Sequence, residues 1–249
     1  SARTPTVRTP PCTVGVSPTG AGNDASVYDI IIHMNEIRPV ASFPDLSLAK
    51  ITVGSGRSLP HWEAAGAIYH VSFHLADSVP QTQLETWRAE RLRISELAKT
   101  EGRPLTQDEI ELLKRVYDEH VERYLTSGYG SCHLRRPEVG EALKKTICQA
   151  NGEKYALHEW CIMPNHVHII VGGFTDLAPI RDILQIWKSA SAHRMNRILE
   201  RTGEVWHRDA YTRIIRDRDE YSHQMSYVWN NPELAGLKDG FLRDRYVGQ

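Results

Sequence analysis

The sequence predicts an α+β fold in which helices cover one face of an antiparallel four-stranded sheet. Four short segments are rich in β-branched or aromatic residues and are bounded by turn residues, as strands are. They are residues 67–75, 154–163, 166–172 and 211–216. Longer segments carry apolar residues at helical spacing and lie between or after these strands. They are residues 137–149, 180–201 and 219–231. This strand and helix order is typical of the ferredoxin-like arrangement.

Residues 1–58 form a segment that we expect to be a mostly disordered tail. Thr, Pro, Gly, Ser and Ala dominate it, and apolar residues are too few to offset the conformational entropy lost on ordering. Residues 28–33, Tyr-Asp-Ile-Ile-Ile-His, are an exception that could form a short strand or a docking segment. Ordered structure is expected to begin near His61, so the predicted folded domain spans residues 59–249.

The first strand of the predicted sheet has one apolar face. In residues 67–75 the apolar side chains of Tyr69, Val71 and Phe73 alternate with polar ones. The segment 84–126 then interrupts the core with two helical stretches, which we expect to pair as an inserted hairpin. Its second helix should begin at residues 106–109, Thr-Gln-Asp-Glu, because this pattern fits a capping box.

The second and third strands are separated only by residues 164–165, so they should form a hairpin. Pro137 is well suited to the first turn of a helix, and Pro232 should end the last one. In a ferredoxin-like sheet the third strand, residues 166–172, is central. The sheet face without helices would then be open to a substrate.

Composition sets the broad class of the protein. Apolar residues make up 41% and charged residues 24%, as in ordinary globular proteins. No apolar run approaches the roughly 20 residues needed to span a bilayer, and the first residues are polar. We therefore expect a cytoplasmic protein. The four cysteines form no Cys-x-x-Cys pair, which argues against structural zinc, and the cytosolic setting argues against disulfides.

The net charge of −1 argues against a strong, non-specific polyanion binder. Nine basic and five acidic residues lie between 181 and 218, which gives this segment a local charge of +4. Such a run can be no more than a solvated face. The alternative is a phosphate-binding surface formed by the arginines in and after the helix 180–201. These candidates are Arg194, Arg197, Arg201, Arg208, Arg213 and Arg216.

Two histidines form a candidate metal site. His166 and His168 are two residues apart on a candidate strand, so their side chains point to the same face. Imidazoles about 7 Å apart along a strand can converge on one divalent cation. The alternative is a pair of half-buried histidines that bind nothing. The apolar residues that flank the pair favour a rigid element, as a metal site needs.

Tyr227 and Asn231 are four residues apart on a candidate helix and therefore share a face. They could be a core tyrosine and a helix-ending asparagine. Beside a metal site they indicate another chemistry. A cation that holds a phosphate aligns it for in-line attack, and the tyrosine oxygen can then form a covalent intermediate. The amide oxygen of Asn231 could complete a shell that suits Mg²⁺ or Mn²⁺.

Residues 163–171, Met-Pro-Asn-His-Val-His-Ile-Ile-Val, resemble the M-P-N-H-V-H segment of the single-tyrosine HUH transposases. The resemblance is greatest to the REP-associated tyrosine transposases. It extends over residues 59–238 through several further matching segments. These are residues 59–61, 66–71, 151–155, 187–189, 204–206, 215–217, 227–232 and 235–237. Tyr211-Thr212 departs from the family pattern, which usually has an aromatic residue followed by Asp, and the N-terminal tail lies outside it.

The resemblance implies a ferredoxin-like catalytic domain that acts on single-stranded or hairpin DNA, as a monomer or homodimer. By position, His166, His168 and Asn231 would be the metal ligands. Tyr227 would nick the strand, leaving a 5′-phosphotyrosine and a free 3′-hydroxyl. Two alternatives from other classes stay open. One is a non-catalytic DNA-binding protein derived from such a transposase, and the other is an unrelated metal hydrolase that does not need Tyr227.

Overall fold

The computed structural model describes residues 43, 50–52, 61–64, 66–103, 106, 108–109, 112, 121–172 and 179–246. Two sheets and several helices lie within these ranges. The strands are β1 (Lys50–Thr52), β2 (His61–Glu63), β3 (Ile68–His74), β4 (Ala156–Ile162), β5 (His166–Gly172), β6 (Tyr211–Ile215) and β7 (Leu242–Arg245). The helices are α2 (Gln81–Thr100), α4 (Glu122–Thr126), the 3-10 turn η4 (His133–Arg135), α5 (Pro137–Cys148), α6 (Ile180–Ile198) and α7 (Arg218–Leu234).

The α+β class and the antiparallel sheet are confirmed. The main sheet has five strands in the order β6-β3-β5-β4-β7, and every neighbouring pair is antiparallel. β3 and β5 are central, as the ferredoxin-like order requires for the third strand. The fifth strand, β7, was not predicted from the sequence. It extends the sheet beyond β4, and its charged sequence Leu-Arg-Asp-Arg hides the alternation that marks the other strands.

A second, two-stranded sheet is formed by β1 and β2, whose register pairs Lys50 with Glu63. β1 lies inside the segment 1–58 that we predicted to be mostly disordered, so ordered structure begins before His61. Most of that segment, including the candidate strand 28–33, lies outside the described residues. The tail therefore stays a prediction.

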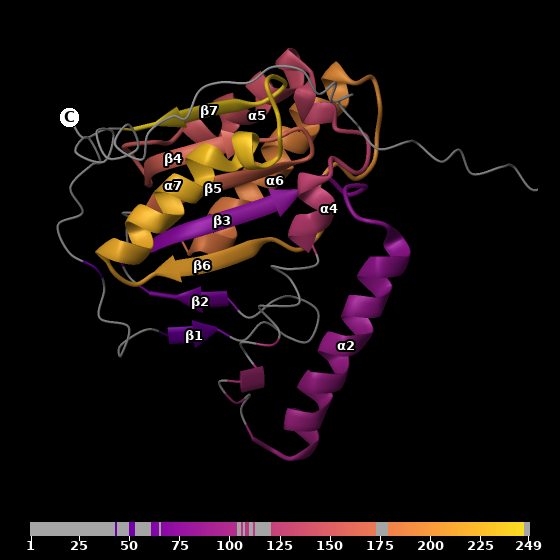
Figure 1. The fold of residues 1–249 in the computed structure, drawn as a ribbon, viewed down its shortest axis with the longest axis vertical. Helices are drawn as coiled ribbons and strands as arrows, with labels where there is room; N and C mark the ends of the chain where they lie inside the picture. Colours follow the sequence, from indigo (N-terminus) through magenta and orange to yellow (C-terminus); the bar gives the residue numbers. More distant parts are fainter. Residues whose placement is uncertain are drawn as a thin grey trace, which may run out of the picture.

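The main sheet separates two hydrophobic layers (Figure 1). Helices α5 and α6 cover one face, where Ile183 and Trp187 of α6 pack with Val167, Ile169 and Val171 of β5. The opposite face was expected to be open, but α7 lies across it. Tyr221, Met225 and Val228 of α7 pack there on a smaller apolar cluster, which consists of Ile68, Cys161, Met163, Ile170 and Ile215. These apolar side chains on the second face are the reason why it needs a cover.

Helix α7 also differs from the prediction at its end. Pro232 was expected to terminate the helix, but α7 continues to Leu234. Pro232 cannot donate to the carbonyl of Val228, so α7 lacks this one hydrogen bond, and the helix ends two residues later. The carbonyls at this end are satisfied by the Ala235 N–H, which donates to Asn231, and by the Leu237 N–H, which donates to Pro232.

The inserted segment has a small core of its own. Leu84 and Trp87 of α2 pack with Val121 and Leu125 at α4, and Val79 completes this cluster. The helical pairing expected for residues 84–126 is thus present where the two ends of the insertion meet. Most of residues 104–120 lie outside the described residues. None of the described helices is both long enough and apolar enough to cross a membrane.

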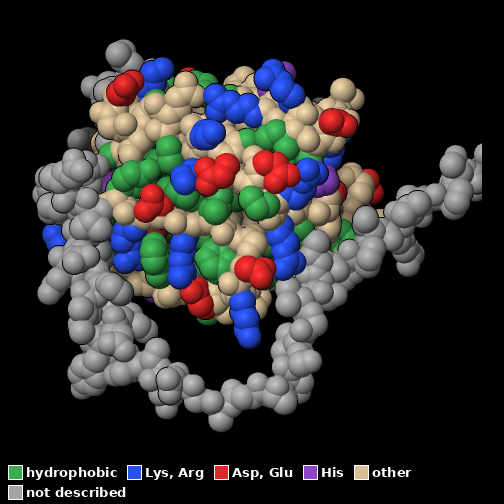
Figure 2. Space-filling model, turned by 90° about the horizontal axis from the view of Figure 1, so that it is seen from above, with side chains coloured by type: hydrophobic (Ala, Val, Ile, Leu, Met, Phe, Trp, Pro, Cys, Tyr) green, Lys and Arg blue, Asp and Glu red, His purple; other side chains and the backbone are tan. Residues whose placement is uncertain are grey.

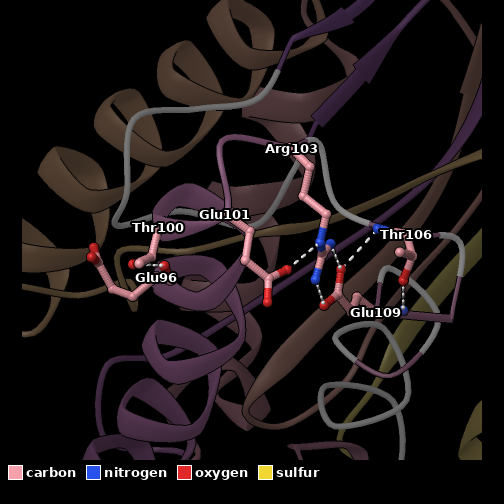
Figure 3. Close-up of polar contacts among 6 residues, drawn as sticks. All are labelled: Glu96, Thr100, Glu101, Arg103, Thr106 and Glu109. Atoms are coloured by element: carbon pink, nitrogen blue, oxygen red, sulfur yellow. Dashed lines mark hydrogen bonds and ion pairs between the residues drawn. The ribbon is translucent and has the colours of Figure 1, made fainter.

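The capping box predicted at Thr106 is present (Figure 3). The Thr106 N–H donates to the Glu109 carboxylate at 2.8 Å, and the Glu109 N–H donates to the Thr106 hydroxyl oxygen at 3.2 Å. Arg103 holds Glu109 through both terminal nitrogens, at 2.7 and 2.8 Å, and Glu101 through Nε. The Arg103 guanidinium, followed by the Thr106 hydrogen bonds, lowers the pKa of Glu109 to about 2.

The packing of β5 predicts how much the central core contributes to stability. Ile169 has no exposed surface, whereas 58% of Ile186 on α6 is exposed. Ile169→Ala should lower the free energy of unfolding by about 2–5 kcal/mol, because it leaves a cavity between the sheet and its helices. Ile186→Ala should change it by less than about 1 kcal/mol. Urea denaturation of both variants checks this, and equal losses would contradict the described layers.

Candidate active site

The pairing of β3 with β5 gathers histidines on the face of the sheet beneath α7. His74 of β3 is opposite His166 of β5, and Ser72 is opposite His168. Because alternate residues of a strand share a face, His70 lies on this face as well. His166 and His168 are 0% and 1% exposed, and their ring centroids are 4.8 Å apart. The structure therefore places the two predicted ligands next to each other and inside the protein.

Asn165 fixes which nitrogen of His166 is available. Nδ1 of His166 lies 2.7 Å from Oδ1 of Asn165, and Nδ2 of Asn165 donates to the Tyr129 carbonyl at 3.0 Å. Since the amide nitrogen faces a carbonyl, the oxygen faces the imidazole and accepts from Nδ1–H. Nε2 of His166 is then left with its lone pair. Outer hydrogen bonds of this kind orient the histidines of metal sites.

A similar chain of contacts orients His168. Its Nδ1 lies 3.1 Å from Nε2 of His70, and the side chain of Gln224 on α7 interacts with His70 in turn. If His70 donates to Gln224, its Nε2 accepts the proton of His168 Nδ1, and Nε2 of His168 keeps its lone pair. Both ligand candidates are thus arranged to present Nε2 to the same space.

These Nε2 atoms suit a cation. Both are buried, and neither has a hydrogen-bond partner of standard geometry among the described residues. Oε1 of Glu122 lies 3.5 Å from Nε2 of His168, and one ligand atom each from Glu122, His166 and His168 lie within 4.8 Å of one another. Two ligand atoms that are each about 2.1 Å from one ion are about 3–4.2 Å apart, so this group is close to the spacing that a single divalent cation needs.

The N-terminus of α7 is held by a pair of acidic side chains. The Asp217 carboxylate caps the helix by accepting from the Glu220 N–H at 2.8 Å. Glu220 accepts from the Arg216 N–H at 2.9 Å and forms an ion pair with Arg213 of β6. These bonds set where α7 starts and so which of its residues face the histidines.

The structure also brings Tyr227 and Asn231 to this cluster. The ring centroid of Tyr227 is 5.5 Å from that of His168, and its hydroxyl donates to Oε1 of Glu122 at 2.5 Å. Asn231 is 4% exposed, and its side chain interacts with His166. Two imidazoles, a carboxylate, an amide and a phenol therefore meet beneath one helix. Such a group can bind a cation and present a nucleophile beside it.

Burial determines the charge of the histidines. It lowers the pKa of His70, His74 and His166 to about 3, and the neighbouring imidazoles add to this effect. The three rings are therefore neutral at pH 7, which is the form that binds metals. Burial alone would raise the pKa of Glu122, but His168, His166 and the Tyr227 hydroxyl outweigh it and lower this pKa. Glu122 is thus a carboxylate.

The six candidate arginines do not form one surface. Arg194, Arg197 and Arg201 belong to α6 or follow it, on the side of the sheet opposite the histidines. Arg194 donates to Thr146 and to Gln149, next to α5, which shows a structural role for it. Arg201 donates to the Glu204 carbonyl and lies 3.3 Å from the His133 ring.

Arg213 alone of the six shares the face of the histidines, because its register partner on β3 is His70. Arg208 is exposed before β6, and Arg216 is exposed directly after it. The face of the molecule seen from above carries charged side chains of both signs. There basic and acidic side chains are interspersed (Figure 2), so this side does not present a single-sign surface for a phosphate backbone.

Sequence reasoning did not find every residue of the site. His70 was detectable, because it shares the two-residue alternation of the first strand. Asn165 looked like a turn residue, and its hydrogen bonds became visible only with the structure. Glu122 had no signal in the sequence, where it is one more polar residue of an inserted helix. Only the return of the chain at α4 brings it to the histidines.

Comparison with known proteins gives one family match. Residues 132–231 match the family model described as "Transposase IS200 like". No curated protein shows a significant match to the chain. Among solved structures, a REP-associated tyrosine transposase bound to a REP hairpin is 14% identical, with 71% of this chain and 72% of that chain covered and a TM-score of 0.37. A protein from Deinococcus radiodurans R1 described as a transposase is 17% identical, with 68% and 93% covered and a TM-score of 0.29.

The neutral histidines predict a loss of stability in acid. Unfolded histidines bind protons below a pKa of about 6.5, whereas His70, His74 and His166 stay neutral in the folded protein down to about pH 3. Above pH 6.5 these histidines are neutral in both states. As the pH falls below 6.5, only the unfolded state takes up their protons, so the folded state becomes less stable.

In urea denaturation with a chelator present, each of these histidines should lower the free energy of unfolding by up to roughly 2 kcal/mol between pH 7 and pH 5. His74→Asn should therefore show a smaller difference between the two pH values than the unchanged protein. Equal pH dependence in both proteins would show that His74 does not contribute in this way.

Proposed function

We propose that this chain is a metal-dependent enzyme that nicks single-stranded DNA and transfers the strand through Tyr227, since residues 132–231 match the family model of IS200-like transposases. The family match supports a transposase function on DNA. The observation that carries the finer proposal is the position of the Tyr227 hydroxyl. It donates to Oε1 of Glu122, which lies 3.5 Å from the buried Nε2 of His168, so the phenolic oxygen is beside the candidate metal ligands.

The proposed reaction needs a nucleophile and a means of holding the phosphate. Tyr227 supplies its phenolic oxygen, which forms a bond to phosphorus as the bond from phosphorus to the 3′ oxygen breaks. The phenol loses its proton, and the leaving oxygen gains one and becomes a 3′-hydroxyl. The 5′ end stays on the enzyme as a phosphotyrosine. Attack of another 3′-hydroxyl on this ester reverses the step and joins two strands.

His166, His168 and Asn231 are the proposed protein ligands of a divalent cation, Mg²⁺ or Mn²⁺. Bound there, the cation would polarise the phosphate and offset the negative charge that builds up on it. The two buried Nε2 atoms fit this role because they have lone pairs and no other partner of standard geometry among the described residues. The Asn231 amide is near enough to interact with His166.

The DNA is proposed to approach over β6 and α7. Arg213 shares the histidine face, and Arg208 and Arg216 are exposed at the two ends of β6. Single-stranded or hairpin DNA is the substrate that the M-P-N-H-V-H and Tyr-x-x-x-Asn segments favour. We assign this activity to residues 59–249. The alternative, a DNA-binding protein without activity, is separated from it by the first experiment below.

The covalent step gives the first prediction. The protein is incubated with Mn²⁺ and a pool of hairpin oligonucleotides, and a denaturing gel is examined for a covalent protein–DNA band. The unchanged protein should form this band, and Tyr227→Phe should not, because it lacks the attacking oxygen. Tyr246→Phe is the matched control. The hydroxyl of this tyrosine is hydrogen-bonded to Cys148, away from the site, so the variant should still react.

Binding is measured in the same samples by a mobility shift. Binding that persists in Tyr227→Phe, together with the loss of the covalent band, supports the nicking mechanism. Hairpin binding without a covalent band in the unchanged protein would favour the non-catalytic alternative. A band that persists in Tyr227→Phe would show that another residue attacks.

The arginine surface gives the second prediction. Changing both Arg213 and Arg216 to Ala should weaken hairpin binding and lower the slope of log affinity against log salt by up to about 2, because two phosphate contacts are lost. Arg194→Ala should leave the slope unchanged, since this arginine belongs to α6, which covers the face of the sheet opposite the histidines. Binding by fluorescence anisotropy at several salt concentrations checks this. An unchanged slope in the double variant would refute the proposed DNA path.

A further inference from the structure

We propose that Glu122, a residue of the helical insertion, is a carboxylate ligand of the cation held by His166 and His168. This inference rests on the proposed function, because it adds a ligand to the site that the function requires. It assigns a role to the insertion at residues 84–126, for which the sequence suggested none. The insertion would then be part of the active site and not an appendage of the fold.

The first support is geometric. Within the described parts of the chain, Glu122, His166 and His168 are the one group of three acidic, histidine or cysteine side chains that is close enough to share an ion. The Glu122 side chain is 28% exposed, whereas the His168 side chain beside it is 1% exposed. The carboxylate therefore lies at the mouth of the site, between the buried imidazoles and the solvent from which an ion and a substrate would come.

The second support is electrostatic. An imidazole that binds a cation is neutral, and the amide of Asn231 carries no charge. Such ligands leave the charge of a divalent cation uncompensated in a buried place, which is costly. Glu122 is the acidic member of the group, and its carboxylate would supply a negative charge beside the two imidazoles. A mixed set of imidazole and carboxylate ligands also suits Mn²⁺.

The third support is that the fold fixes the position of Glu122. On one side of it, Val121 and Leu125 are buried against α2 in the core of the insertion. On the other, the chain after α4 is anchored to the sheet. Gly130 has φ +97°, and a Cβ there would lie 2.6 Å from the Asp77 carbonyl oxygen, so this close approach requires glycine.

The chain that follows α4 is also linked to His166 by hydrogen bonds. Asp77 accepts from the Ser131 N–H at 2.9 Å, which holds the chain that follows α4. The carbonyl of Tyr129 accepts from the side chain of Asn165, and that side chain also accepts from Nδ1 of His166. The segment that carries Glu122 and the imidazole of His166 are therefore positioned by one shared amide.

The carboxylate also connects the cation site to the nucleophile. Tyr227 donates its hydroxyl hydrogen to Oε1 of Glu122, the oxygen that lies nearest to Nε2 of His168. A ligand that accepts from the phenol would hold the attacking oxygen next to the phosphate bound at the cation. Glu122 would therefore both bind the cation and accept the hydrogen bond from Tyr227. A change from carboxylate to amide separates these two roles. The amide oxygen of Gln can still accept from Tyr227, but it carries no charge.

The test is Mn²⁺ binding by titration calorimetry to the full chain without DNA. The unchanged protein should bind one Mn²⁺, and His166→Ala should abolish binding. Glu122→Gln should weaken it about 10-fold or more, since loss of even an outer partner of a metal ligand costs 10- to 100-fold. Glu96→Gln is the matched control, because the side chain of this glutamate is exposed on α2 of the same insertion and forms an ion pair with Lys99. Its affinity should be unchanged.

A second measurement does not depend on affinity. Mn²⁺ should slow backbone hydrogen exchange at residues 121–127 in the unchanged protein, because the ion ties α4 to the sheet. It should not do so in Glu122→Gln. Mn²⁺ affinity and exchange that are the same in Glu122→Gln and in the unchanged protein would overturn the inference, while the His166→Ala loss would still support the cation site. No Mn²⁺ binding by the unchanged protein would overturn both.

Discussion

The two-residue period of β5 at the centre of the sheet is the constraint on which the structure depends. Val167, Ile169 and Val171 point into the layer of α5 and α6, and their burial holds the core together. The residues between them must then point to the other face, and there the chain has His166 and His168. A slip of one residue would exchange the two faces and bury the imidazoles among apolar side chains. The stability of the core therefore fixes the orientation of the site.

Neutral imidazoles are the electrostatic consequence of this arrangement. The histidines lie between the sheet and α7, where burial makes protonation unfavourable and holds the pKa of His166 at about 3. A lone pair that is buried and has no proton is a poor feature for stability, because it has lost its hydrogen bonds to water. It is a good feature for binding a cation. A metal ion bound to these lone pairs would replace the hydrogen bonds to water that they have lost.

Asn165 connects elements that are far apart in the sequence. Its backbone carbonyl accepts from the Leu75 N–H at 2.9 Å and from the Ser78 hydroxyl, so it holds the end of β3. Its side chain joins Tyr129, after the insertion, to His166. One buried residue thus aligns the strand pair, the insertion and a proposed ligand. This sharing explains how an insertion of 43 residues, by its predicted bounds 84–126, can contribute to a site without disturbing the sheet.

Local patterns were sufficient for most of the elements. Alternation and helical spacing predicted β3, β4, β5, β6, α5, α6 and α7 to within a few residues, because each buries one face and repeats with a fixed period. The capping box at Thr106 was predicted for the same reason, since its two hydrogen bonds involve residues three apart. The spacing of His166 and His168, and of Tyr227 and Asn231, likewise placed each pair on one face of its element.

The sequence by itself therefore determined the class of the fold, the central strand and the pairs of residues that could carry chemistry. Tertiary structure decided what no local period encodes. It placed α7 over the face that was expected to be open, added β7 to the sheet, and separated Arg194 from Arg213. It also brought Glu122 to the histidines from more than 40 residues away along the chain. Such contacts depend on where distant segments meet, and that is set by packing of the whole chain.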